Sequence, residues 1–195
     1  MKVYRVVPDV NRYQSFSLEK EAQERELSAL RNFEETPMTF NGTPKADNWV
    51  PPGVFIYMPK LKNGNFPGFQ YTQTLVVDET ALEGLRDFLE MSGELLPLPY
   101  KDKLYHVLNV VPFVNALDDN KTQWVYGKNT GEKIRIDRYA FRADRLAGTF
   151  LFKIPETNEI LTCEGIKNPN EEFKGRVERL GLKGLLFEEL WTDDA

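Results

Sequence analysis

The sequence predicts an α+β fold, with a mixed, largely antiparallel sheet and a few packed helices. Two observations point to this class: few stretches show helical periodicity while many short ones have strand character, and the two kinds follow one another in mixed order. A chain of 195 residues is ordinary for one domain. Residues 1–195 are therefore predicted to form a single domain, in which the halves 1–100 and 101–195 could share one core.

The N-terminal part is predicted to contain a strand, a surface helix and an irregular segment. Residues 2–7 alternate as a strand that ends at Pro8. Ser17 is predicted to cap a helix. The segment 34–70, rich in glycine, proline and aromatic residues, indicates irregular packing around a short strand at 54–58. The apolar stripe expected on the helix consists of Leu18, Ala22, Ala29, Leu30 and Phe33.

Residues 73–98 predict a strand, a helix and a second strand. "QTLVV" is typical of a strand, and Asp78 is positioned to cap the helix that follows. Gly93 is predicted to end this helix in a left-handed conformation, before the strand "ELLPL". The buried stripe expected on the helix is Ala81, Leu82, Leu85, Phe88 and Leu89.

The sequence of the C-terminal part predicts the same order of strand, helix and strand. "EILTC" indicates a strand, and Asn168-Pro169 is expected to start a helix in which Glu171 completes a capping box. The expected stripe is Phe173, Val177 and Leu180, and Gly181 ends the helix. Two units of one plan suggest an internal duplication.

Between these units, three more stretches predict strands: 105–111, 134–139 and 149–154. The first belongs to "YHVLNVVPFVNALDDNKT", an apolar run closed by two aspartates. Asp118 to Thr122 is predicted to form the turn that leaves this central strand, since aspartate side chains bond nearby backbone N–H groups. Asn109 is expected to satisfy buried partners, and the whole stretch is interpreted as scaffold.

Charge and composition exclude several classes of function. The net charge of −5 argues against a nucleic-acid partner and favours association with a basic protein. Cys163 is the only cysteine, which suggests a reducing compartment. The apolar stretch 104–117 is shorter than the roughly 20 residues that a spanning helix needs, and the N-terminus does not resemble a signal peptide. We therefore expect a cytoplasmic protein without a membrane segment.

Catalytic signals are nearly absent. His106 is the only histidine and has no ligand or triad spacing around it. The run from Asp118 begins like a calcium loop but has Gln123 and Asn129 where glycine and glutamate are needed. No phosphate-binding or dinucleotide motif occurs. We expect no catalytic residue, no cofactor and no metal site. The basic cluster Lys133, Arg135, Arg138, Arg142 and Arg145 is interrupted by aspartates, which favours paired surface charges over a nucleic-acid stripe.

Several segments, in their order, resemble a bacterial immunity-protein family first recognised in myxobacteria. They are "YHVLNVVPFVNALD" with Thr122 after it, Trp49 in its proline-rich setting, "LVVDETALEGLRDFLE" and "ERLGLKGLLFEEL". The family tends to place serine where Thr122 and Asp78 stand, and an acidic residue where Gly68 stands. The resemblance implies a non-catalytic protein that binds a cognate toxin stoichiometrically. A chaperone or adaptor for a secreted effector is the alternative, and a carboxylate-dependent hydrolase using Asp118 and Asp119 is a further one.

Two sets of residues follow from this interpretation. The glutamate-rich face of the first helix and the aromatic loops after it are candidate partner surfaces, with a toxin, basic in charge, as the expected partner. The oligomeric state is left open. The candidate partner-binding residues are Glu19, Glu24, Glu34, Glu35, Trp49 and Phe66. The residues of the structural motif are Tyr105, Leu108, Asn109, Asp118, Thr122, Gly181 and Gly184.

Overall fold

The computed structural model confirms the predicted α+β class, and it describes residues 1–32, 36, 38–70 and 74–193. Within these residues no helix is both long and apolar enough to span a bilayer. The helices are α1 (Lys20–Arg31), α2 (Glu79–Ser92) and α3 (Phe173–Arg179), with 3₁₀ turns η1 (Ala46–Asn48), η2 (Ala143–Arg145) and η3 (Pro169–Glu171). The strands are β1 (Lys2–Pro8), β2 (Ser15–Leu18), β3 (Val54–Tyr57), β4 (Gly68–Phe69), β5 (Leu75–Val77), β6 (Gly93–Tyr100), β7 (Lys103–Val110), β8 (Gln123–Tyr126), β9 (Lys133–Arg138), β10 (Leu151–Phe152), β11 (Leu161–Glu164) and β12 (Leu185–Thr192).

Two sheets form the middle of the molecule, with strand orders β5-β7-β6 and β10-β11-β1-β12. All pairs within them are antiparallel. A small sheet, β3-β2-β4, and a two-stranded ribbon, β8-β9, complete the described strands. As predicted, the strand that begins the opening motif is central, because β7 pairs with β5 on one side and β6 on the other.

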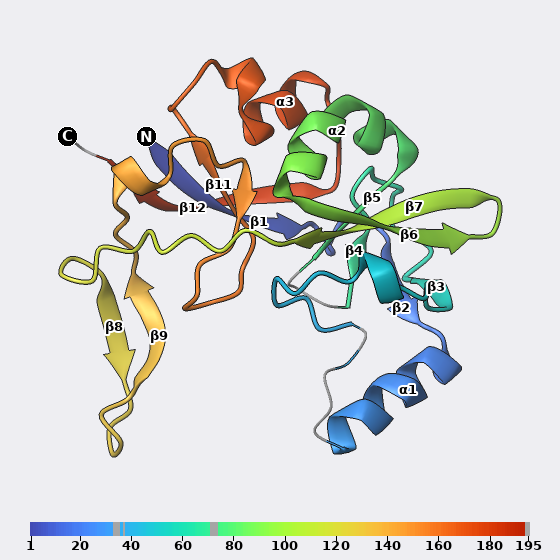
Figure 1. Ribbon diagram of the computed structural model, residues 1–195. Helices are drawn as coiled ribbons and strands as arrows, with labels where there is room; N and C mark the ends of the chain where they lie inside the picture. The colour runs from blue at the N-terminus through green and yellow to red at the C-terminus, as the bar shows by residue number, and fades with distance from the viewer. Residues whose placement is uncertain (33–35, 37, 71–73, 194–195) are drawn as a thin grey trace.

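Helices α2 and α3 lie side by side over one face of the two central sheets (Figure 1). The predicted stripe of α2 is buried throughout, and it packs on residues from β5, β7, β1 and β10 in one cluster with Phe173 and Val177 of α3. Asp78 caps α2 as expected, since its carboxylate accepts the backbone N–H of Ala81 at 2.8 Å. Both halves of the chain thus contribute to one apolar core.

The opposite face of each sheet, here called the lower face, is also covered. Below β5-β7-β6, the residues Val76, Leu96 and Val107 pack against β2, β3 and the segment around Met38 and Phe40. Below β1 and β11, Val3, Leu161 and Cys163 pack against the base of the β8-β9 ribbon and nearby loops. Alternation along β7 explains this, because Val107 faces down while Leu108 faces the helices.

The two predicted strand-helix-strand units have the same topology. In the first, β5 and β6 run parallel and are joined by α2, with β7 antiparallel between them. In the second, β11 and β12 run parallel and are joined by α3, with β1 antiparallel between them. The central strand follows its unit in the first case and comes from the N-terminus in the second.

The first helix departs from prediction. Ser17 lies in β2, where its hydroxyl contacts the Gln70 amide, and α1 begins at Lys20 after Glu19 with no side-chain cap. The predicted stripe is wrong in part, because Leu30 is 60% exposed while Glu26 is buried. Phe33 lies outside the described residues. Helix α1 therefore packs on the body through a narrow strip only.

The predicted start of the last helix is also wrong. Asn168 caps the 3₁₀ turn η3, and α3 begins later, at Phe173, so the capping box with Glu171 does not form. The buried Glu172 carboxylate instead accepts three backbone N–H groups, those of residues 165–167. Leu180 is 42% exposed and does not complete the stripe.

Gly93 ends α2 as predicted, but in a different conformation. Its φ of 156° and ψ of −149° open β6 and are not those of an αL cap, but they still lie in a positive-φ region that L side chains rarely adopt. An added Cβ would lie 2.0 Å from the carbonyl oxygen of Asn109, so glycine is needed because the two backbones approach closely. Strand 149–154 is shortened to β10, and β2, β4 and β8 were not predicted.

Burial on β7 gives a matched test of the scaffold. Leu108 is fully buried and Leu104 on the same strand is 50% exposed. Leu108→Ala is expected to lower the free energy of unfolding by about 2–5 kcal/mol, through lost transfer energy and the cavity left behind. Leu104→Ala should change it by less than about 0.5 kcal/mol. Urea unfolding of both variants measures this, and equal losses would contradict the arrangement of β7.

Candidate functional site

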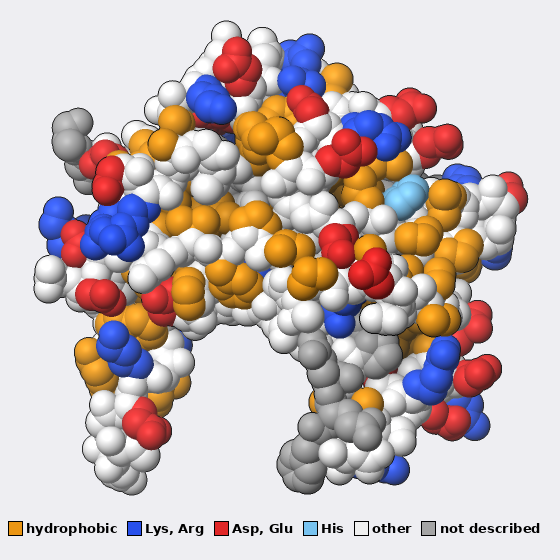
Figure 2. All heavy atoms as spheres, viewed as in Figure 1, with side chains coloured by type: hydrophobic (Ala, Val, Ile, Leu, Met, Phe, Trp, Pro, Cys, Tyr) orange, Lys and Arg blue, Asp and Glu red, His pale blue; other side chains and the backbone are white. Residues whose placement is uncertain are grey.

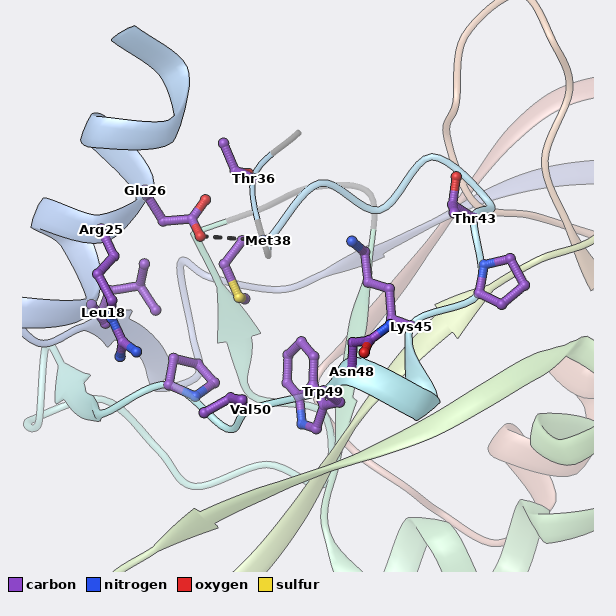
Figure 3. A pocket seen from close by; sticks show the side chains of 13 residues that line it. Leu18, Arg25, Glu26, Thr36, Met38, Thr43, Lys45, Asn48, Trp49 and Val50 are labelled. Carbon is purple, nitrogen blue, oxygen red and sulfur yellow. Dashed lines mark hydrogen bonds between the residues drawn. The ribbon is translucent and has the colours of Figure 1, made fainter. Parts of the chain in front are cut away.

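The main candidate site is a groove of about 500 Å³ between α1 and the segment from Thr36 to Pro52. Figure 3 shows the two walls facing each other across it. Its lining is mostly apolar with a few charged groups. The lining residues are Leu18, Ala22, Arg25, Glu26, Thr36, Met38, Thr43, Pro44, Lys45, Asn48, Trp49, Val50 and Pro52.

The first wall is the strip of α1 that faces the body. Ala22 and Glu26 stand one turn apart and are the buried residues of this helix. The Glu26 carboxylate accepts the backbone N–H of Met38 at 3.3 Å, which joins the two walls (Figure 3). The Arg25 side chain lies beside them and is exposed.

The second wall is irregular chain that side chains of the body hold in place. The carbonyl oxygen of Phe40 accepts the Lys153 ammonium at 2.5 Å and the Asn158 amide at 3.1 Å. The Asn109 amide donates to the carbonyl oxygen of Thr43 at 2.8 Å and to the Glu94 carboxylate at 2.9 Å. Backbone groups of an irregular segment need such partners when they are buried, so these bonds fix the shape of the wall.

The Glu94 carboxylate and Trp49 complete this attachment. Glu94 accepts the backbone N–H groups of Lys45 and Ala46 at 2.7 and 3.1 Å. The indole N–H of Trp49 donates to the carbonyl oxygen of Pro97 at 2.8 Å, so the segment covers the outer edge of β6. Pro97 and Pro99 lie on that edge strand and offer no N–H donor. The 3₁₀ turn η1 thus covers the β6 edge of the sheet and also forms part of the groove.

Two ionisable groups in these attachments have shifted pKa values. Burial raises the pKa of the Glu94 carboxyl, but the N–H of Lys45, the Asn109 amide and the N–H of Ala46 lower it more, and the net pKa lies below its ordinary value. Burial lowers the pKa of the Lys153 ammonium to about 8, because its described acceptor is a neutral carbonyl.

The predicted partner-binding residues fall in different places. Trp49 lines the groove, whereas Glu19 and Glu24 are exposed and are not among its lining residues. Glu24 lies on the side of α1 opposite Ala22, and its carboxylate is 3.8 Å from the Lys20 ammonium. Glu34 and Glu35 lie outside the described residues. Phe66 must be corrected, because it is fully buried in the core beneath α2 and cannot contact a partner. The groove itself was not predicted, since it depends on how 36–52 folds back towards α1.

The residues of the opening motif have structural surroundings. Asn109 is fully buried, and the Tyr105 ring packs edge-on against Phe16 with centroids 5.0 Å apart. The Asp118 carboxylate accepts the N–H of Asn120 at 3.1 Å, and the Thr122 hydroxyl donates to the carbonyl oxygen of Ala140 at 3.2 Å. These contacts are those of a turn that anchors a strand.

Gly181 and Gly184 shape the chain between α3 and β12. Gly181 ends the helix with a φ of 65°, as a left-handed cap does. Gly184 has a φ of 109°, and an added Cβ would lie 2.8 Å from the carbonyl oxygen of Phe66. Both glycines therefore serve the backbone path, and the second permits contact with the Phe66 segment.

Other chemically interesting groups are spread over the molecule. His106 lies in a second, polar groove with Arg86, and burial followed by the Arg86 charge lowers its pKa. Cys163 is buried, which raises its pKa to about 12 and keeps the thiol protonated. Among the described residues, no group of three or more His, Cys, Asp or Glu side chains is placed to hold a metal ion.

Comparison of the sequence with protein families and with curated proteins identifies no relative. No protein-family model matches the chain, and no curated protein matches its sequence. The resemblance to an immunity-protein family therefore stays a prediction.

The Glu94 attachment predicts acid sensitivity. Because its folded pKa lies below the unfolded value, Glu94 contributes stability above about pH 4.5 that is lost as the pH falls through the folded pKa. Glu94→Gln should lower the free energy of unfolding at pH 7 and make its decline towards pH 3 smaller than in the wild type. Urea midpoints at several pH values measure this. Glu90→Gln, at an exposed position on α2, is the control and should keep the wild-type slope.

Lys153 predicts a dependence of the same sign, but at alkaline pH. Its folded pKa of about 8 lies below the ordinary value of 10.5, so the unfolded chain binds more protons between these values. The free energy of unfolding should rise across this window, because deprotonation removes a buried charge. Lys153→Met should show less of this rise in urea titrations at pH 8 to 10.5. An equal rise in both proteins would rule out Lys153 as its source.

Proposed function

We propose that this protein is an immunity protein that binds and neutralises a cognate bacterial toxin in a one-to-one complex, without catalysis. The groove carries the proposal, because it is an open, mostly apolar surface whose shape is fixed by buried hydrogen bonds. A pre-shaped apolar surface favours binding, since less conformational entropy is lost when the partner docks. The groove's charged groups, Arg25, Glu26 and Lys45, do not form a nucleophile with its base.

Electrostatics supports a role in rapid association. The net charge of −5 would attract a basic partner and raise the rate of encounter. Glu19 and Glu24 are exposed at the start of α1, outside the lining of the groove, and such surface carboxylates would act on that rate. Within the interface, the apolar groove would supply the anchor contacts on which affinity depends.

The same surface would serve a chaperone or adaptor of a secreted effector, so the test has to separate silencing from delivery. The protein is used to recover a tightly bound partner from its native cell, and the partner is then expressed alone and together with this chain. Rescue from killing that saturates at equimolar amounts supports neutralisation. Normal growth with failed secretion supports an adaptor, and rescue by far less than one equivalent would show turnover.

A matched pair of surface changes tests the groove. Val50 lines it and is 66% exposed, whereas Met91 on α2 is 67% exposed and lies outside it. Val50→Glu should weaken partner binding at least about tenfold and reduce protection, because a charge would be desolvated in the apolar contact. Met91→Glu should leave both unchanged. Calorimetric titration measures the affinity, and equal affinity of the two variants would remove the groove from the interface.

A further inference from the structure

The β8-β9 ribbon projects from the body as an arm (Figure 1). Its two strands pair with each other and with no other described strand. An isolated two-stranded ribbon is at best marginally stable in water, and both of its outer edges are open for pairing. The arm is therefore held at its base and leaves the rest of its surface available.

The base of the arm is packed, but the apolar surface continues beyond it. Ile136 is buried beside Trp124 and Phe141 in the cluster below β1 and β11. Ile134 lies two residues further out on β9, at a register irregularity between the Val125–Arg135 and Tyr126–Lys133 pairs, and is 65% exposed. Tyr126 on the paired strand is 53% exposed. Large apolar side chains that no described residue covers are typical of a contact surface.

The arm also differs from the body in charge. Residues 123–138 contain four basic and two acidic side chains, so their net charge is +2. The whole chain has a net charge of −5, so the remaining residues together carry −7. Within the arm, Arg135 is 3.7 Å from Asp137, so one of the charge pairs predicted for the basic cluster forms. Lys133 lies over the Trp124 ring at 4.4 Å, and Lys128 and Arg138 form no ion pair with any described residue. Figure 2 shows that this arm and the region of α1 flank a hollow.

We propose that the arm is a second docking surface for a protein partner, and that it takes an acidic face with an apolar depression that accepts Ile134. The inference rests on the proposed function, because the partner is the neutralised toxin. A basic arm on an acidic body fits a partner with charges of both signs. Such an arrangement fixes the orientation of the complex, since a partner turned the other way would meet like charges at both contacts.

A nucleic acid fits the same surface less well. Phosphate binding requires a continuous positive face, whereas Glu132 and Asp137 interrupt this arm and the body behind it carries −7. Single-stranded binding also uses several exposed rings for stacking, and Tyr126 is the one aromatic residue of the arm that is more than half exposed. The alternating charges match an acidic protein surface better than a phosphate backbone.

A selection experiment tests this surface without the toxin. Phage displaying random twelve-residue peptides are selected on the immobilised full-length protein, and phage that also bind the double variant Ile134→Ser/Arg135→Glu are removed. The remaining peptides should be rich in Asp and Glu next to an apolar residue. A synthetic peptide from this set should bind the wild type about tenfold tighter than the variant, with an affinity that falls as salt is added.

The matched control is Met58→Ser/Lys60→Glu, which makes the same kinds of change on the turn after β3, where Met58 is 54% exposed. This variant should bind the peptide like the wild type. No enrichment, enrichment of basic peptides, or tighter binding of a labelled 20-nucleotide single-stranded DNA would overturn the inference. A toxin that is neutralised equally well by the Ile134→Ser/Arg135→Glu variant would overturn it too, while the proposed function would stand.

Discussion

Both faces of each central sheet are buried, although helices cover only one of them. The other face therefore needs a different cover, and this constraint shapes the rest of the molecule. The lower faces are covered largely by irregular chain, which brings backbone polar groups into a low-dielectric interior. Side chains of the body satisfy them: Lys153 and Asn158 hold the Phe40 carbonyl, and Asn109 and Glu94 hold residues 43–46. The opening motif is therefore scaffold, but scaffold that determines the position of a surface segment.

This arrangement places the residues that determine stability and the two candidate surfaces in different layers, without making them independent. The fully buried residues of β7 and α2 hold the sheets and helices together, and no partner can reach them. The groove and the arm lie in the layer that covers the lower faces, where backbone shape depends on a few polar contacts. A change at Asn109 would thus act on the groove through Thr43 and Glu94, at a distance from any partner. A variant at Asn109 would lose function because the wall of the groove is displaced. The affinity of the folded fraction of that variant for the partner would reveal this displacement.

The sequence predicted what local periodicity controls. The α2 stripe, its Asp78 cap and the central place of β7 follow from spacing and capping chemistry, and so does the α+β class. The start of α1, the exposure of Leu30 and the burial of Phe66 did not, because each depends on where residues 36–70 fold back in space. Trp49 was recognised as a candidate, but the groove around it brings together segments from 18 to 52 and has no local sequence signature.

The shared topology of the two units places the two candidate surfaces in equivalent positions. Each unit is a pair of parallel strands around an antiparallel one, with a helix above and irregular cover below. Under the first unit this cover forms the groove, and under the second it forms the base of the basic arm. Since the helices already shield the upper faces, the lower cover is the layer that could vary in sequence without disturbing the core. Two equivalent layers would give one partner two separate contacts, so each surface can be altered while the other still binds.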